Sequence, residues 1–148
     1  MSDATCDISI PNDLASLSLV MRAIPDYAES QQLSEDTRRA AMLVIEELTT
    51  NIINYGYGAG VHDEIDINLT KQDDALKITI LDGASPFDVE EIEVGIKEDQ
   101  SLEDMAVGGL GLFLVHQFAS SISYQRVGNR NQTRVLLPLG GNGSEGLH

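Results

Sequence analysis

The stretch between Ser34 and Gly56 is the feature that most constrains how this chain can fold. Its apolar residues recur every three or four positions and form one stripe, made up of Ala41, Val44, Ile45, Leu48 and Ile52. A stripe of this kind has to be buried, so the stretch predicts a long helix that packs on a core. Ser34 is the predicted N-cap, because its hydroxyl can accept a hydrogen bond from a backbone N–H of the first turn.

Alternating segments predict the layer on which this helix packs. Apolar and polar residues alternate, as in half-buried strands, over Ile8–Ile10, Glu64–Thr70, Ala75–Leu81, Ile122–Val127 and Gln132–Leu139. Turns are expected at residues 71–74 and 128–131, and a further helix over Asp13–Tyr27 that ends at or soon after Pro25. One sheet with helices on one face follows, which is an α+β two-layer sandwich.

The composition bounds the class of protein. With 148 residues the chain is expected to form one domain over residues 1–139, followed by a glycine-rich, disordered tail at 140–148. The net charge of −15 argues against nucleic acids and anionic membranes as partners, because both repel an acidic surface. No apolar run reaches membrane-spanning length, no signal peptide is apparent, and Cys6 has no partner for a disulfide, so a cytoplasmic location is expected.

Two polar residues flank the apolar stripe. Glu47 and Asn51 are four apart, so they lie one above the other on the helix, and Tyr55 continues this row. A carboxylate can accept a proton or orient a water, and an amide oxygen can bind a hard cation such as Mg²⁺. Taken alone the pair is typical of a solvated helix face, so its meaning depends on the other segments.

Two further segments favour a nucleotide site. Asp82 stands at the end of a predicted strand, where its carboxylate could accept a hydrogen bond from a purine amino group; the alternative is an ordinary Asp-Gly turn. Glycines at 108, 109 and 111 lead into an apolar helix, whose free N–H groups and dipole favour phosphate. Glycines also permit tight helix packing, and no P-loop lysine is present.

In this order and spacing, the segments resemble the ATP-binding domain of the GHKL group, which includes gyrase, histidine kinases and mismatch-repair ATPases. The similarity is greater to the anti-sigma-factor serine/threonine kinases of bacterial partner-switching systems. Glu47 and Asn51 match the N box of that family, and Asp82–Asp88 matches its first glycine box. Gly109–Leu112 matches the second glycine box, and Gly128–Thr133 resembles the closing hairpin.

The resemblance implies a Bergerat-type ATP-binding fold, with one mixed sheet covered on one face by helices. It also implies that the site takes ATP or ADP with Mg²⁺, with Glu47 as the base, Asn51 on the metal and Asp82 on adenine. The other residues expected at the nucleotide are Tyr55, Ala84, Phe87, Gly108, Gly109, Leu110, Gly111, Leu112 and Thr133.

The activity implied is ATP-dependent phosphorylation of a small STAS-type antagonist protein, with a sigma factor and a second copy of the chain as further partners. Ala84 replaces a family glycine and is expected to crowd the nucleotide, so Ala84→Gly should tighten binding. The lid segment Asp88–Asp104 carries eight carboxylates against one lysine. These departures leave open an alternative, a nucleotide-sensitive protein-binding regulator with little or no kinase activity. An ATPase within a larger assembly is a third reading, although it requires an additional transducer domain.

Overall fold

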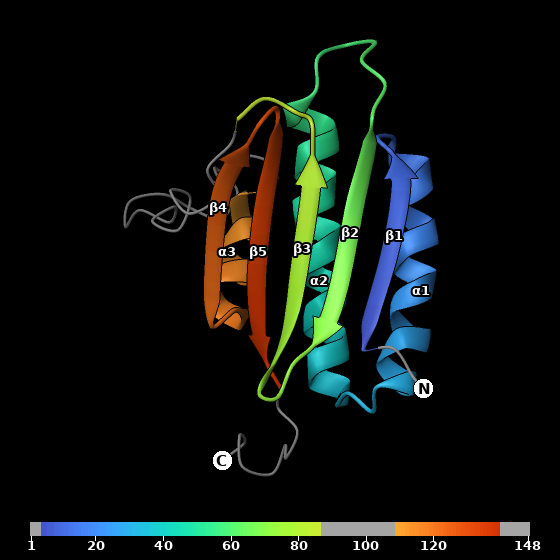
Figure 1. The fold of residues 1–148 in the computed structure, drawn as a ribbon, viewed down its shortest axis with the longest axis vertical. Coiled ribbons are helices and arrows are strands. Elements are labelled where there is room, and N and C mark those ends of the chain that lie inside the picture. The colour runs from blue at the N-terminus through green and yellow to red at the C-terminus, as the bar shows by residue number, and fades with distance from the viewer. Residues whose placement is uncertain (1–3, 87–108, 140–148) are drawn as a thin grey trace.

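The computed structural model describes residues 4–86 and 109–139. Five strands form one sheet in the order β1-β2-β3-β5-β4 (Figure 1). Their bounds are β1 Thr5–Pro11, β2 Glu64–Lys71, β3 Ala75–Asp82, β4 Ser121–Val127 and β5 Arg130–Pro138.

The helices all lie on one face of this sheet, which confirms the α+β two-layer sandwich (Figure 1). They are η1 Leu14–Ser16, α1 Leu17–Ser30, α2 Glu35–Asn51 and α3 Gly109–Phe118, and a π-helix, η2 Ile52–Gly56, continues α2. No helix in the described parts of the chain is long and apolar enough to cross a membrane.

The sheet is antiparallel at every described strand pair, whereas a mixed sheet was expected. The reason is the crossover that contains α3. It carries the chain from β3 to β4, which runs parallel to β3 but not beside it, and the β4–β5 hairpin then returns β5 into the gap between them. The two parallel strands are thereby separated by an antiparallel neighbour.

The core lies between the sheet and the helices. Alternate residues of the strands face it and are buried, among them Ile65, Ile67, Leu69, Leu76, Ile78, Ile80, Val135 and Leu137. From α2 the predicted stripe residues Ala41, Val44, Ile45 and Leu48 are buried in the same cluster. The hydroxyl of Ser34 caps α2 as predicted, because it accepts a hydrogen bond from the Thr37 N–H at 3.1 Å.

Helix α1 does not end near Pro25 but continues to Ser30. A proline inside a helix removes one backbone hydrogen bond and costs about 3 kcal/mol. Packing offsets that cost here, since Ile24, Tyr27 and Ala28 around the proline are buried. Tyr27 also fixes this end of α1 to the sheet, because its hydroxyl accepts from the Lys71 N–H at 2.9 Å.

The β4–β5 hairpin is tighter than expected. Only Gly128 and Asn129 lie between the strands, and Gly128 has a φ of +63°. Asn131, which was expected in the turn, is therefore the second residue of β5 and pairs with Asp82 of β3.

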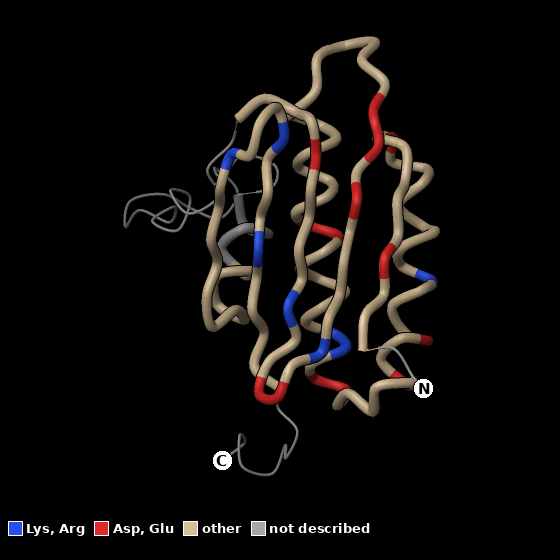
Figure 2. The backbone as a smooth tube through the Cα atoms, in the orientation of Figure 1, with Lys and Arg blue, Asp and Glu red and all other residues tan. Residues whose placement is uncertain are grey.

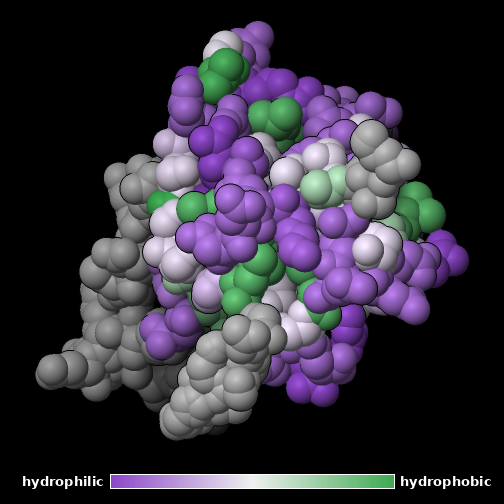
Figure 3. Space-filling model, turned by 60° about the horizontal axis from the view of Figure 1, so that its bottom comes forward, coloured by the Kyte–Doolittle hydropathy of each residue, from purple (hydrophilic) through white to green (hydrophobic). Residues whose placement is uncertain are grey.

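The uncovered face of the sheet is polar and divided by charge. Asp7, Glu64 and Asp66 lie on β1 and β2, whereas Lys77, Arg130 and Arg134 lie on β3 and β5 (Figure 2). Figure 3, in which the end of the molecule at the β2–β3 turn comes forward, shows a mostly hydrophilic surface with separate hydrophobic spots.

Candidate functional site

The candidate site begins at the C-terminal end of α2. Asn51 is the last residue of this helix, and its Nδ2 donates to the backbone carbonyl of Glu47 at 2.7 Å. Because the amide nitrogen is engaged within the helix, Oδ1 is the atom of Asn51 that can serve a cation. Glu47 and Asn51 are both half-buried, one turn apart, as the sequence predicted.

The helix changes type directly after Asn51. Residues Ile52–Gly56 form a π-helix, in which each turn holds an additional residue. Tyr55 therefore leaves the row of Glu47 and Asn51, and its side chain is 60% exposed. Single π turns are frequent at functional sites, because they displace the following residues from regular helical positions.

Glu47, the residue predicted to act as the base, is half-buried. Partial burial raises the pKa of its carboxyl group, and the negative charge of Glu46 raises it further. A carboxylate with a raised pKa holds a proton more tightly once it has accepted one, which is the property a general base requires.

Asp82 lies on the helix-facing side of the sheet, at the end of β3. Its side chain is 1% exposed, and Oδ1 accepts from the Ala84 N–H at 2.9 Å and from Asn131 Nδ2 at 2.8 Å. Burial raises the pKa of Asp82, while those two hydrogen bonds and the charges of Arg130 and Arg126 oppose the rise. Both hydrogen bonds go to Oδ1, so Oδ2 has no hydrogen-bond partner among the described residues.

The turn after Asp82 packs on the π-helix, which brings the two predicted motifs together. The Ser85 N–H donates to the Gly56 carbonyl at 3.0 Å. The methyl group of Ala84 is 4% exposed and faces Gly56, where a Cβ added to the glycine would lie only 2.7 Å from the Ala84 Cβ. Ala84 thus fills the space that Gly56 leaves, so its methyl group has a packing partner within the fold.

This packing predicts the effect of Gly56→Ala. Two methyl carbons cannot approach to 2.7 Å, so the variant should lose about 1–3 kcal/mol of unfolding free energy through overpacking. Adding Ala84→Gly in the same chain should restore most of the loss, and Ala84→Gly alone should leave ATP affinity nearly unchanged. Urea unfolding of the four chains of this double-mutant cycle measures the coupling. Additive losses would show that the two residues are not in contact.

A second cluster holds the turn from the other side. The Tyr57 hydroxyl donates to Asp63 Oδ2 at 2.7 Å, and the Gly83 N–H lies 3.1 Å from both of these oxygens. Burial and the hydrogen bond to Asp63 raise the pKa of Tyr57, so the phenol remains protonated. A Cβ on Gly83 would approach Asp63 Oδ2 to 2.5 Å, so a larger residue there would displace the Asp63 carboxylate.

Asn131 is the buried residue that the sequence reasoning missed. It is 3% exposed, and its Nδ2 also donates to the carbonyls of Ala84 and Ser85, at 3.2 and 3.0 Å. Its Oδ1 accepts from Arg126 Nη1 at 2.8 Å and from the Tyr124 hydroxyl. A signal was present, because Gly-Asn between two alternating runs is a typical two-residue hairpin loop, which puts residue 131 in the strand.

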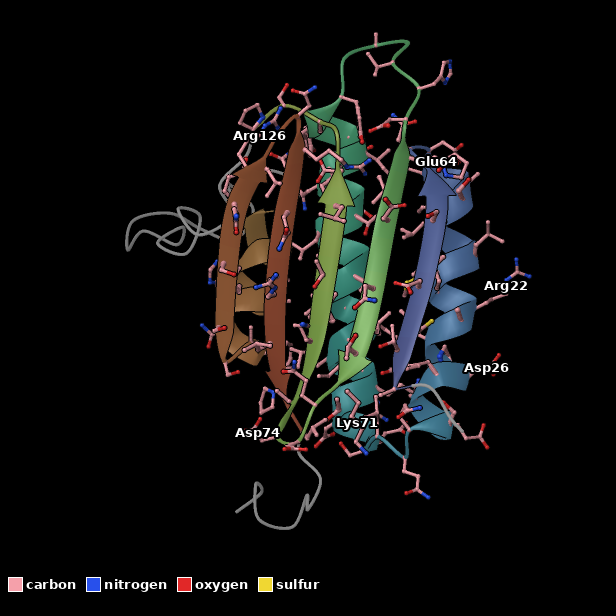
Figure 4. All side chains as sticks on the ribbon, in the orientation of Figure 1. Arg22, Asp26, Glu64, Lys71, Asp74 and Arg126 are labelled. Atoms are coloured by element: carbon pink, nitrogen blue, oxygen red, sulfur yellow. The ribbon has the colours of Figure 1, made fainter. Side chains whose placement is uncertain are left out.

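Arg126 ties the closing hairpin to the turn. Figure 4 shows it on β4, at the end of the sheet where β3 ends. Besides its bond to Asn131, Nη1 donates to the Ala84 carbonyl at 2.9 Å. Thr133, predicted at the nucleotide, is buried on the same side of the sheet, two residues along β5 from Asn131.

The second glycine box is described only in part. Gly109 is the first residue of α3, and Gly111 lies in its first turn, as predicted. The side chains of Leu110 and Leu112 are not described. Phe87, Gly108 and the acidic segment Asp88–Asp104 lie outside the described residues.

The donors present fit a magnesium ion that is held mainly by phosphate and water. Within residues 4–86 and 109–139 no three His, Cys, Asp or Glu side chains gather to hold a metal. Mg²⁺ in nucleotide sites usually takes one or two protein oxygens and keeps several waters. Asn51 Oδ1, whose amide partner is already bonded, suits that role.

Comparisons with known proteins agree with the fold. The family model for the histidine kinase-like ATPase domain matches residues 10–137. The RsbU and RsbW domains of Rv1364c from Mycobacterium tuberculosis superpose with a TM-score of 0.62 at 10% identity, over 91% of this chain and 32% of that one. The SiaB–SiaC complex from Pseudomonas aeruginosa gives 0.57 at 14% identity, over 90% and 89%.

The chain therefore spans about a third of the Mycobacterium tuberculosis structure, whereas it covers most of the Pseudomonas aeruginosa chain. At these identities both likenesses establish the fold, and a search of curated proteins found no match. The family match extends over most of the sequence, from β1 to β5, and includes Glu47, Asn51, Asp82 and Thr133. The chain belongs to the histidine kinase-like ATPase domain family.

Proposed function

We propose that this chain is an ATP-dependent serine/threonine protein kinase of the partner-switching type, which phosphorylates a small STAS-type antagonist protein. The observation that supports it best is the contact between the π-helix after Asn51 and the turn after Asp82. The Ser85–Gly56 hydrogen bond joins them, so the amide proposed to bind the metal and the carboxylate proposed to recognise the base lie on two elements that touch. A nucleotide could then be held at both its phosphate and its base end.

The roles follow from the chemistry of each group. Glu47, with its raised pKa, would accept the proton of the partner's hydroxyl as that oxygen attacks the γ-phosphorus. The bond from the γ-phosphorus to the bridging oxygen would break, and ADP would leave. Asp82 Oδ2 would accept a hydrogen bond from the adenine amino group. Helix α3 begins at Gly109, and the free N–H groups at its N-terminal end would stabilise the negative charge of the phosphates.

Magnesium, when bound at Asn51, would neutralise charge on the phosphates and hold them in line for transfer. A protein substrate is proposed on the resemblance to the partner-switching kinases. A structural neighbour was solved as a complex of SiaB with SiaC, which also favours a protein partner. A sigma factor and a second copy of the chain are further partners proposed on the family resemblance.

Transfer of labelled phosphate tests the proposal. The chain is incubated with γ-labelled ATP, Mg²⁺ and STAS-type proteins encoded near its gene, and label on serine or threonine is measured. Label that appears on one partner and depends on Mg²⁺ is the expected result. ATP binding and partner binding without any transfer would instead favour the nucleotide-sensitive regulator.

Asn51→Ala should abolish Mg²⁺-dependent ATP binding while the fold remains intact. The side chain is half-buried and its one described hydrogen bond lies within the helix, so the change in unfolding free energy should stay within about ±0.5 kcal/mol. Calorimetry with Mg²⁺ and with EDTA measures the first effect, and thermal unfolding the second. Asn54→Ala, at an exposed position three residues on, is the matched control and should bind normally. A large drop in melting temperature for Asn51→Ala would identify it as structural.

A further inference from the structure

The amide of Asn131 has only one orientation that satisfies its surroundings. Two donors, Arg126 Nη1 and the Tyr124 hydroxyl, meet its oxygen, and three acceptors meet its nitrogen. Rotating the amide by half a turn would place oxygen against a carboxylate and two carbonyls, and nitrogen against a guanidinium. The Nδ2 donor is therefore fixed on Asp82 Oδ1.

This donor acts on a carboxylate that is nearly inaccessible to water. Asp82 is 1% exposed, so its protonation state depends on its protein neighbours. Burial favours the neutral acid, whereas the hydrogen bonds from Asn131 and Ala84 favour the charged form. Arg130 and Arg126 also favour the charge, and the Tyr57 and Asp63 pair lies on the far side of Gly83.

The protonation state decides which purine Asp82 can recognise. A charged carboxylate can only accept hydrogen bonds, so it fits the 6-amino group of adenine and repels a 6-oxo group. A neutral carboxyl can donate, so it tolerates the 6-oxo group. The donor on Oδ1 also leaves Oδ2 as the oxygen that meets the base.

We propose that Asn131 is a specificity-determining residue, which holds Asp82 as a charged acceptor and so selects 6-amino over 6-oxo purine nucleotides. Asn131 is a positioning residue in this account, because it acts through Asp82 and not on the nucleotide. Arg126 supports it by fixing the orientation of the amide. The inference rests on the proposed ATP-binding function and adds to it the means by which the base is chosen.

The test compares ATP with inosine triphosphate, which carries a 6-oxo purine. Affinities of the full chain are measured by calorimetry at saturating Mg²⁺ from about pH 5.5 to about pH 8.5, a range that spans the neutral region. The wild type should prefer ATP throughout. Asn131→Leu keeps the size of the side chain and removes its donor, so the charged form of Asp82 loses about 10- to 150-fold of its preference over the neutral form, the effect of one hydrogen bond to a charged group. ATP affinity at neutral pH should fall by up to that factor.

Two features separate this role from a structural one. ATP binding by Asn131→Leu should weaken further as pH falls, because Asp82 without its donor becomes neutral more easily. The ratio of ATP affinity to inosine triphosphate affinity should also decrease. Gln132→Leu, the neighbouring amide on the uncovered face of the sheet, is the matched control and should behave as the wild type. Arg126→Met, at an exposed position, provides a second variant with a smaller shift in the same direction if Asn131→Leu does not fold.

Each result decides the matter. Equal losses for both nucleotides with an unchanged pH profile, in whichever variant folds, would overturn the role of Asn131 and leave the kinase proposal standing. A wild-type chain that binds neither nucleotide would overturn both. A wild type that binds ATP and inosine triphosphate equally would overturn the selection of the base alone.

Discussion

Replacing Glu47 with glutamine is expected to lower the rate of phosphoryl transfer about a hundred- to ten-thousand-fold, the contribution of a well-placed general base. Glutamine has nearly the same shape and cannot accept the proton, so the fold and ATP affinity should be retained. Single-turnover transfer from labelled ATP to the partner protein measures the chemical step separately from binding. Calorimetry on the same preparation measures ATP affinity.

The pH dependence provides a second readout of the same residue. Burial and then the charge of Glu46 raise the pKa of Glu47, so the acid limb of the rate profile should lie above the ordinary value of a glutamate, about 4.3. Transfer should fall as pH drops through that raised pKa, because the base becomes protonated. Glu46→Gln is the matched control: it should retain transfer at neutral pH and move the acid limb to lower pH.

Retention of full activity by Glu47→Gln would mean that the partner's hydroxyl needs no base on α2. An acid limb that stays in place in Glu46→Gln would show that another group controls the profile. Loss of ATP binding together with transfer would instead assign Glu47 to nucleotide or metal binding.

The parts of the fold that could be predicted are those that depend on local pattern. Apolar residues recur over several turns of α2, and apolar and polar residues alternate along β2 and β3. Burial of one face of each element can therefore be predicted from the sequence alone. The Ser34 cap is also local, because it needs only the first turn. Asp82 at a strand end follows in the same way.

The remainder depends on contacts between distant segments. The π turn at Ile52–Gly56 has no periodic signature, and it removes Tyr55 from the row that a regular helix would continue. The methyl of Ala84 could not be assigned to Gly56 from the sequence, because they are 28 positions apart and only the folded turn brings them together. Helix α1 was expected to end at or soon after Pro25, but burial of one face of the helix extends it to Ser30.

The position of Asn131 shows how a small error in a turn can hide a functional residue. Placing the hairpin loop over four residues leaves Asn131 in solvent, whereas a loop of two residues moves it into β5 opposite Asp82. The side-chain period of a strand is two, so such a shift decides whether a residue faces solvent or the core. The candidate site is thus a pair of strand residues joined to the end of α2.

Asp82→Asn is expected to weaken ATP binding about 10- to 150-fold at neutral pH, while the melting temperature of the free chain stays the same or rises. The amide oxygen of asparagine can still accept from Ala84 and Asn131, so the internal hydrogen bonds survive. Its Nδ2 then stands where Oδ2 was, and a donor faces the adenine amino group.

The stability part follows from the direction of the pKa shift. Burial raises the folded-state pKa of Asp82, so the protonated carboxyl group is more compatible with the fold than the charged one. Its contribution to stability is fully present below the unfolded-state pKa and is lost as pH rises through the folded-state pKa. At neutral pH the charge therefore opposes folding, and the neutral asparagine avoids this. The stability difference between the variant and the wild type should vanish below about pH 4, near the ordinary value of an aspartate.

Thermal unfolding from about pH 3.5 to about pH 8 tests the predicted change in stability, over a range that brackets the ordinary aspartate pKa. Calorimetry with ATP tests the predicted loss of binding. Asp66→Asn, on the uncovered face of β2, is the matched control and should bind ATP normally. A variant that loses stability at neutral pH would show that Asp82 serves the fold, whereas one that keeps ATP affinity would remove it from base recognition. Loss of binding with retained stability is the result expected of a carboxylate kept for its ligand, since the free protein would fold as well or better without its charge.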